Sequence, residues 1–121
     1  MSAWNAIPAG QPLGETRRDL IGIHFALNEP CSCGCGNPIR EPVNMHHGVL
    51  PKAKWRYVSK ENWDVRDHPC NLFVINAECH DNHPGPRFFW ALAVKRYGEK
   101  AVRAWYQEAQ RCFKSTLEDY S

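Results

Sequence analysis

Two adjacent histidines, His46 and His47, are the residues of this chain whose types and spacing most directly suggest chemistry. They stand in the stretch VNMHHGVLPK, in a chain of 121 residues that contains six histidines. In an extended segment successive side chains point to opposite faces, so one imidazole could bind a metal ion while its neighbour acts on a bound molecule. In a helix the two rings would diverge, so this interpretation requires a strand.

Two further histidines, His80 and His83, occur in the stretch CHDNHPG. Residues three apart lie on the same side of a helix, and we predict a short helix from about 77 to 83 that packs across the strands. His46 and His80 could then converge on one ion. Neutral imidazoles suit zinc, manganese or nickel, and two or three protein ligands leave a coordination position open for water or substrate.

The six cysteines favour a second metal site over disulfide bonds. The N-terminal residues have no pattern typical of a signal peptide, so we expect a cytoplasmic protein whose thiols stay reduced. No stretch approaches the roughly 20 apolar residues that cross a membrane. The alternatives are small buried cysteines without metal, or a disulfide-linked secreted domain, which the missing export signal disfavours.

The elements that must position these side chains are those of one α+β domain over residues 1–121, with 43% hydrophobic and 23% charged residues. The stretch NLFVI is β-branched and aromatic, as strands are, and we expect it to pair in antiparallel fashion with the strand that carries the two histidines. Apolar residues in the first long segment fit a helix or a strand, and its polar first turn favours a helix. In chain order we predict an irregular arm (1–14), an N-terminal helix (15–29), a strand (43–49), a long loop (50–69), a strand (71–75) and two C-terminal helices (86–114) separated at Gly98.

Basic residues are concentrated in two segments, although the net charge is only +2. From His46 to Lys60 there are four basic residues and no acid, and from Arg87 to Lys114 there are seven basic residues against two acids. Such clusters attract phosphates, although ordinary solvated helix faces fit the charges equally well. Trp55 and Trp63 could stack on bases, but core packing is the commoner use of tryptophan. The candidate DNA contacts are Lys52, Lys54, Arg56, Lys60, Arg87, Lys95, Arg96 and Arg103.

The segments MHHG, CNLFVI and CHDNH together resemble the HNH, or His-Me finger, endonucleases, which share a ββα-metal core. The resemblance covers about residues 31–84. It implies that His46 is a metal ligand, His47 the general base, Asn71 a supporting residue and His80 the second ligand. Asn71 and His80 are nine positions apart, as in the colicin nuclease domains. His83 lies three residues after His80, where the colicin type has four, so it could ligate the metal, touch a phosphate or do neither.

The resemblance also implies a structural zinc, which many members hold with two Cys-x-x-Cys knuckles. This chain departs from that pattern, because the second knuckle retains only Cys79 and has Asn76 where a cysteine is expected. We therefore predict a zinc site made by three cysteines of the first turn and one of the second. Cys70 is a poorer fourth ligand, because an extended strand separates it from Cys79, and Cys112 is expected to be a packing residue. The predicted zinc ligands are Cys31, Cys33, Cys35 and Cys79.

The function implied by the resemblance is metal-dependent hydrolysis of DNA phosphodiester bonds. The ion could be Mg²⁺, Mn²⁺, Ni²⁺ or Zn²⁺, and the enzyme could nick one strand or cut both as a homodimer. Small proteins of this kind occur in phages and prophages, which would place the protein in the host cell cytoplasm. The alternative is a zinc-stabilised nucleic-acid-binding module that cuts nothing. The intact base position, His47, favours the enzyme, because a structural site has no use for an unligated histidine beside a ligand.

Overall fold

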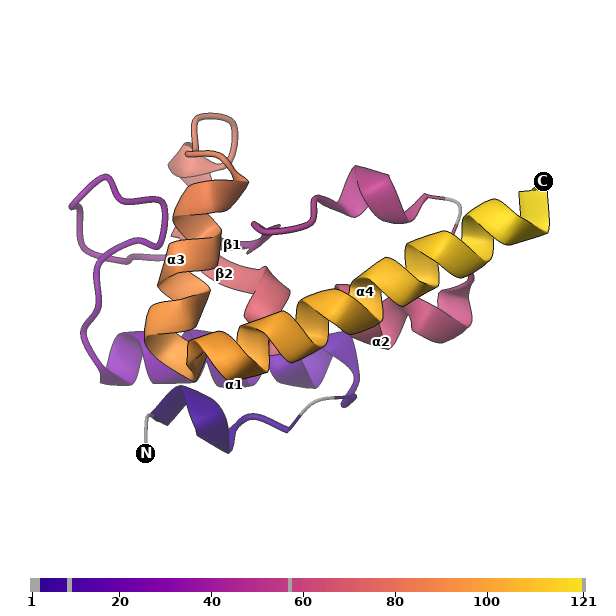
Figure 1. Cartoon of the computed structure of the whole chain (residues 1–121). Coiled ribbons are helices and arrows are strands. Elements are labelled where there is room, and N and C mark those ends of the chain that lie inside the picture. Colours follow the sequence, from indigo (N-terminus) through magenta and orange to yellow (C-terminus); the bar gives the residue numbers. More distant parts are fainter. Residues whose placement is uncertain (1–2, 9, 57, 121) are drawn as a thin grey trace.

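The computed structural model describes residues 3–8, 10–56 and 58–120, with side chains up to Phe113. Within this part of the chain the fold has four α-helices, several 3₁₀ turns and one two-stranded antiparallel sheet, so the predicted α+β class is confirmed (Figure 1). The helices are α1 (Leu13–Ala26), α2 (Trp63–Arg66), α3 (Pro86–Tyr97) and α4 (Glu99–Tyr120), and the strands are β1 (Val43–His47) and β2 (Leu72–Asn76).

The predicted antiparallel pairing of the two strands is confirmed, with Val43 opposite Asn76, His46 opposite Phe73 and His47 opposite Leu72. Every residue of β2 is buried. The reason is that α1 contacts this strand, while Phe89 of α3 packs on Phe73 with ring centroids 4.9 Å apart. A strand covered in this way consists of consecutive apolar residues instead of an alternating pattern.

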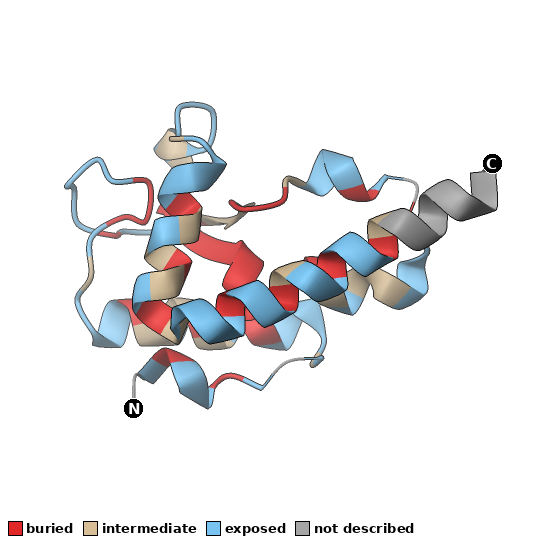
Figure 2. Ribbon diagram, in the orientation of Figure 1, coloured by how far each residue is buried: buried red, intermediate tan, exposed pale blue. Residues whose placement is uncertain are grey.

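Two clusters of apolar side chains form the core, and they meet at β2. Figure 2 shows the ribbon of this strand coloured as buried. One cluster joins Phe73 to α3, α4 and the segment after β1, and Trp55 and Trp105 are among its largest members. The other joins Leu72 and Val74 to α1, to the N-terminal segment and to the cysteine turn. The two histidine-bearing segments are therefore attached to the same buried strand.

Several predicted boundaries are wrong. The segment 50–69 is not an irregular loop, because it contains α2 and the 3₁₀ turns η2 (Lys52–Trp55), η3 (Lys60–Asn62) and the start of η4 (Pro69–Asn71). The arm 1–14 contains the 3₁₀ turn η1 (Ala3–Ala6), and α1 begins at Leu13 and ends at Ala26, so the range 15–29 is displaced.

The helix predicted from 77 to 83 is also wrong. Only the 3₁₀ turn η5 (Ala77–Cys79) forms there, and the chain then turns until α3 begins. Pro84 contributes to the difference, since a proline disfavours the helical conformation in the residue before it, here His83, and donates no hydrogen bond. By contrast, the predicted break between the last two helices is confirmed at Gly98, whose φ of +91° suits glycine.

None of the helices in the described part of the chain has the length and apolar character needed to cross a membrane.

Candidate functional site

A cavity of about 500 Å³ opens between β1, the start of α1 and the turn that follows β2. It combines four histidines with two basic side chains and a few apolar ones. The residues that line it are Leu13, Arg17, Met45, His46, His47, Pro51, Lys52, His80 and His83. The four histidines that were predicted to act together thus border one space.

His46 occupies the centre of the histidine group. Its ring centroid lies 3.9 Å from that of His83, 6.4 Å from that of His80 and 5.0 Å from that of Phe89. Burial, together with the neighbouring His83, His47 and His80, lowers the pKa of His46 to about 4. The ring is therefore neutral at neutral pH and keeps a lone pair for a metal ion.

His83 and His80 approach His46 from the turn after β2, and each has one ring nitrogen already near a partner. His83 Nδ1 lies 3.0 Å from the carbonyl oxygen of Pro84, to which it must donate, so the lone pair of a neutral His83 is on Nε2. His80 is exposed, with Nδ1 3.4 Å from an oxygen of Asp81. The rings of His46, His80 and His83 do not form a tight ligand group, because the His80 ring lies further from His46 than the His83 ring does.

His47 lines the same cavity but bonds to a different partner. Its Nε2 lies 2.8 Å from Oδ1 of Asp67, and both side chains are almost buried, at 12% and 10% exposure. Arg66 donates two hydrogen bonds of 2.8 Å to the same carboxylate. Burial raises the pKa of Asp67, but the hydrogen bonds from His47 and Arg66 outweigh it and lower that pKa overall. No local sequence pattern predicts this pair, because its members are 20 positions apart.

Asn71 is fully buried directly before β2 and makes four hydrogen bonds. Its Oδ1 accepts from the backbone N–H groups of Val49 and Leu50 at 3.1 and 2.8 Å, and its Nδ2 donates to the carbonyl oxygens of Leu50 and Arg66 at 3.0 Å each. The Asn71 amide therefore joins the segment after His47 to the end of α2. Gly48, which stands between His47 and Val49 in the chain, has no room for a side chain, because a Cβ there would meet Phe89 at 2.5 Å.

Four cysteines form a second group, in which the sulfur atoms of Cys31, Cys33, Cys35 and Cys79 all lie within 4.8 Å of one another. No other set of three or more potential ligands in the described part of the chain is as compact. Four thiolates in this arrangement could bind a metal ion such as zinc. Cys70 is not among them, since it lies in the apolar core, where burial raises its pKa to about 12.

Asn76, which stands where the second knuckle would have a cysteine, has a structural role. Its Oδ1 accepts from the backbone N–H of Arg40 at 2.8 Å, and its Nδ2 donates to the carbonyl oxygen of Pro38 at 3.0 Å. The backbone N–H of Asn76 donates to the sulfur of Cys31 at 3.2 Å. The cysteine turn is thereby attached to the end of β2 without a fifth cysteine.

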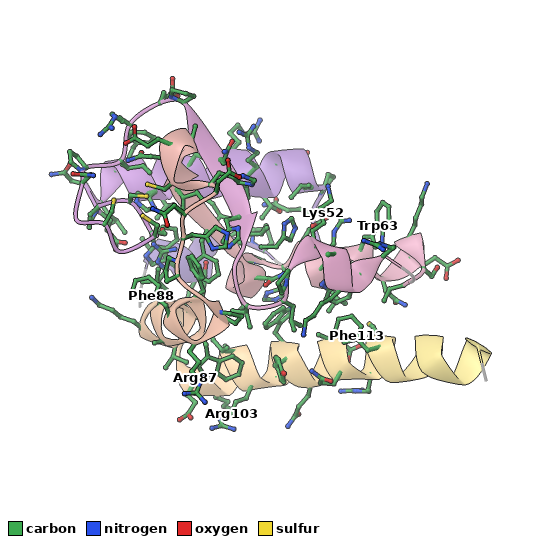
Figure 3. The ribbon with its side chains drawn as sticks, turned by 90° about the horizontal axis from the view of Figure 1, so that it is seen from above. Lys52, Trp63, Arg87, Phe88, Arg103 and Phe113 are labelled. Carbon is green, nitrogen blue, oxygen red and sulfur yellow. The ribbon has the colours of Figure 1, made fainter. Side chains whose placement is uncertain are left out.

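The predicted DNA contacts do not share one face. Lys52 lines the histidine cavity, whereas Arg87 and Arg103 project from α3 and α4 on the side away from it (Figure 3). Arg103 is exposed and pairs with Glu99. The remaining lysines and arginines of this set, apart from Arg96, are also exposed: Lys54, Arg56, Lys60 and Lys95.

Arg96 must be removed from the set, because its side chain is only 4% exposed. It donates to Ser32 at 3.0 Å and to Glu29 at 3.3 Å, and its guanidinium lies 4.0 Å from the ring centroid of Trp4. An arginine held in this way stabilises the packing of α3 against the N-terminal segment and cannot reach a nucleic acid. Trp55 is likewise a core residue, 1% exposed.

Arg17 of α1 also lines the cavity and was not predicted as a site residue. Its Nη2 lies 3.4 Å from the carbonyl oxygen of Val43, at the beginning of β1. Its place in the sequence, in the polar first half of a helix, looks like that of any solvent-exposed residue. Only the contact of α1 with the sheet brings Arg17 to the histidines.

Comparisons of this chain with models of protein families, with curated proteins and with solved structures found no match.

Proposed function

We propose that this protein is a metal-dependent DNA endonuclease of the HNH type, which hydrolyses phosphodiester bonds. The observation that carries the proposal is the cavity in which two adjacent strand histidines, His46 and His47, meet His80 and His83. In this proposal β1, β2 and α3 would form the ββα-metal core, with α3, whose Phe89 contacts both Phe73 and His46, in place of the helix expected from 77 to 83.

His46 and His80 are the proposed ligands of a divalent ion, with His83 as a third. The chemistry of this donor set fits, because His46 is neutral and the lone pair of His83 is on Nε2, away from its bond to Pro84. Imidazole nitrogens suit Zn²⁺, Ni²⁺ and Mn²⁺. When bound, such an ion supplies positive charge that offsets the negative charge developing on the phosphate and on the departing oxygen.

His47 is the proposed general base. Its Nε2 is engaged by Asp67, so the nitrogen that can accept a proton from water is Nδ1. As the water oxygen bonds to phosphorus, its proton passes to Nδ1 and the bond from phosphorus to the 3′ oxygen breaks, and that oxygen then takes a proton from solvent. The products are a 5′ phosphate and a 3′ hydroxyl.

Arg17 and Lys52 are the proposed phosphate contacts closest to the reaction. They come from α1 and η2 and line the histidine cavity. Contacts of lysine and arginine with phosphates carry no base information, so we expect binding that is indifferent to sequence and weakened by salt. The exposed basic residues Arg87 and Arg103 would contact DNA beyond the cavity, because they face another side (Figure 3).

The cysteine group is the proposed site of a structural zinc. Cys79 comes directly before His80, so an ion held by all four thiolates would fix the turn that carries this histidine. The alternative function, a zinc-stabilised module that binds nucleic acid without cutting it, uses the same cysteines. It gives no role to the bond between His47 and Asp67, which is why we prefer the enzyme.

The test is incubation of the purified protein with supercoiled plasmid and Mg²⁺, Mn²⁺, Ni²⁺ or Zn²⁺, each beside a chelated control. We expect relaxed or linear plasmid with at least one ion and none after chelation. Unchanged plasmid with every ion, under conditions in which the protein binds DNA, would favour the binding module.

A further inference from the structure

A chain of nearly buried polar groups leads from His47 into the protein. It consists of His47, Asp67 and Arg66, whose side chains are 12%, 10% and 9% exposed. The guanidinium of Arg66 also lies 4.3 Å from the ring centroid of Trp63. Charged groups this far from solvent are stable only when they are paired and hydrogen-bonded, as these are.

The hydrogen bonds determine which nitrogen of His47 carries the proton. An ionised carboxylate can only accept, and the two hydrogen bonds from Arg66 favour the ionised form of Asp67. His47 Nε2, 2.8 Å from Oδ1, must therefore be the donor, and the lone pair of the neutral ring is on Nδ1. The opposite tautomer would place a lone pair against the carboxylate and leave Nδ1 unable to accept a proton.

The backbone around this chain of groups is fixed as well. The carbonyl oxygen of Arg66 accepts from Nδ2 of Asn71, and the same amide bonds to Val49 and Leu50, which follow His47. The segment after the strand that carries the imidazole and the end of α2, directly before Asp67, are thus joined through one buried side chain. The Asn71 amide thus fixes the backbone near both partners of the hydrogen bond between His47 and Asp67.

We propose that Asp67 is the positioning residue of the general base: it holds His47 in the Nε2–H tautomer and stabilises the imidazolium that forms when Nδ1 takes the proton of water. This proposal rests on the proposed nuclease function. After proton transfer His47 has both ring nitrogens protonated, and its Nε2–H still donates to the Asp67 carboxylate, which remains ionised. Asp67 touches neither the water nor the phosphate.

The kinetic test is a double-mutant cycle on plasmid cleavage with His47→Ala, Asp67→Asn and the combined variant. Asp64→Asn, which removes an exposed acid from α2, three positions before Asp67, is the matched control. Asp67→Asn should lower kcat by up to about 10⁴-fold, the loss seen when the carboxylate that holds a general-base histidine in the correct tautomer is changed to an amide, with KM unchanged. Asp64→Asn should cleave at the wild-type rate.

The cycle distinguishes positioning from mere structural support. If Asp67 acts through His47, the combined variant should be as slow as His47→Ala alone, within about twofold. A further fall in the combined variant, or a wild-type rate for Asp67→Asn in an enzyme that needs His47, would overturn the positioning role while leaving the nuclease proposal intact. Failure of the nuclease proposal looks different, because the wild-type protein itself would then not cleave.

A measurement on the unaltered protein guards against a variant that does not fold. The ¹⁵N chemical shifts of imidazole nitrogens distinguish the two neutral tautomers, and the signal that is missing in His47→Ala assigns the ring. We expect a protonated Nε2 and an unprotonated Nδ1 for His47. A ring protonated on Nδ1 alone would contradict the proposal whatever the kinetics.

Discussion

Replacement of Asn71 by alanine should destabilise the protein strongly, because this fully buried amide makes four hydrogen bonds. Each such bond contributes about 0.5 to 1.5 kcal/mol, so the loss in free energy of unfolding should be about 2 to 6 kcal/mol. The upper part of this range is a large share of the roughly 5 to 15 kcal/mol that stabilises a typical domain. The backbone N–H groups of Val49 and Leu50 would remain buried without a partner.

Urea unfolding, followed by the fluorescence of buried tryptophans such as Trp55, measures this loss. Asn82→Ala is the matched control, since Asn82 is exposed in a turn and should change stability by less than about 0.5 kcal/mol. A loss below about 1 kcal/mol for Asn71→Ala would refute the reasoning. The Asn71 hydrogen bonds would then not be what joins the segment after β1 to the end of α2.

Three further predictions concern the cysteine group, a buried histidine and the cavity wall. Removal of metal by a chelator should lower the melting temperature measured by calorimetry, because closed thiolate sites contribute directly to folding, and an unchanged melting curve would contradict the zinc site. Burial lowers the pKa of His68 from 6.5 to about 4, so the unfolded chain binds a proton that the folded protein does not, and stability should fall between pH 6.5 and about 4. Urea unfolding should show a smaller fall for His68→Asn, which can still cap η4, and equal falls in both proteins would count against this. Arg17→Gln should weaken DNA binding in a fluorescence anisotropy assay while Arg18→Gln, outside the cavity, should not; equal effects would reject Arg17 as a phosphate contact.

The elements with strong local signals could be predicted from the sequence. The run Phe73 to Ile75 is β-branched or aromatic, and Gly98 separates two helical patterns, so both features follow from local preference. The structure of segment 50–69 could not be predicted in the same way, because Trp55 of η2 is buried against Phe113 of α4, which is distant in the sequence. The helix expected after β2 is replaced by the short 3₁₀ turn η5, and the next helix begins only at Pro86.

The arrangement of the site could likewise be predicted from the sequence only in part. His46 and His47 meet His80 and His83 because the two segments flank paired strands, and that follows from the order of the motifs. The contact of His47 with Asp67 depends on how α2 packs, for which no local pattern gives a signal.

The prediction for Arg96 is wrong because this side chain is buried. The charge of Arg96 on a helix predicts a surface side chain, whereas its partner Glu29 lies 67 positions away in the chain. Long-range pairing of this kind has no counterpart in local sequence patterns.

The most direct test of the central claim is the rate of plasmid cleavage by His47→Ala at a concentration of metal that saturates both variant and wild type. We predict that cleavage falls by about 10² to 10⁴, the usual contribution of general acid-base catalysis, while metal affinity stays at the wild-type value. His46→Ala provides the contrast, since it should lose metal affinity together with activity. Cleavage by His47→Ala at the wild-type rate would contradict the account, because the histidine bonded to Asp67 would then not be the base.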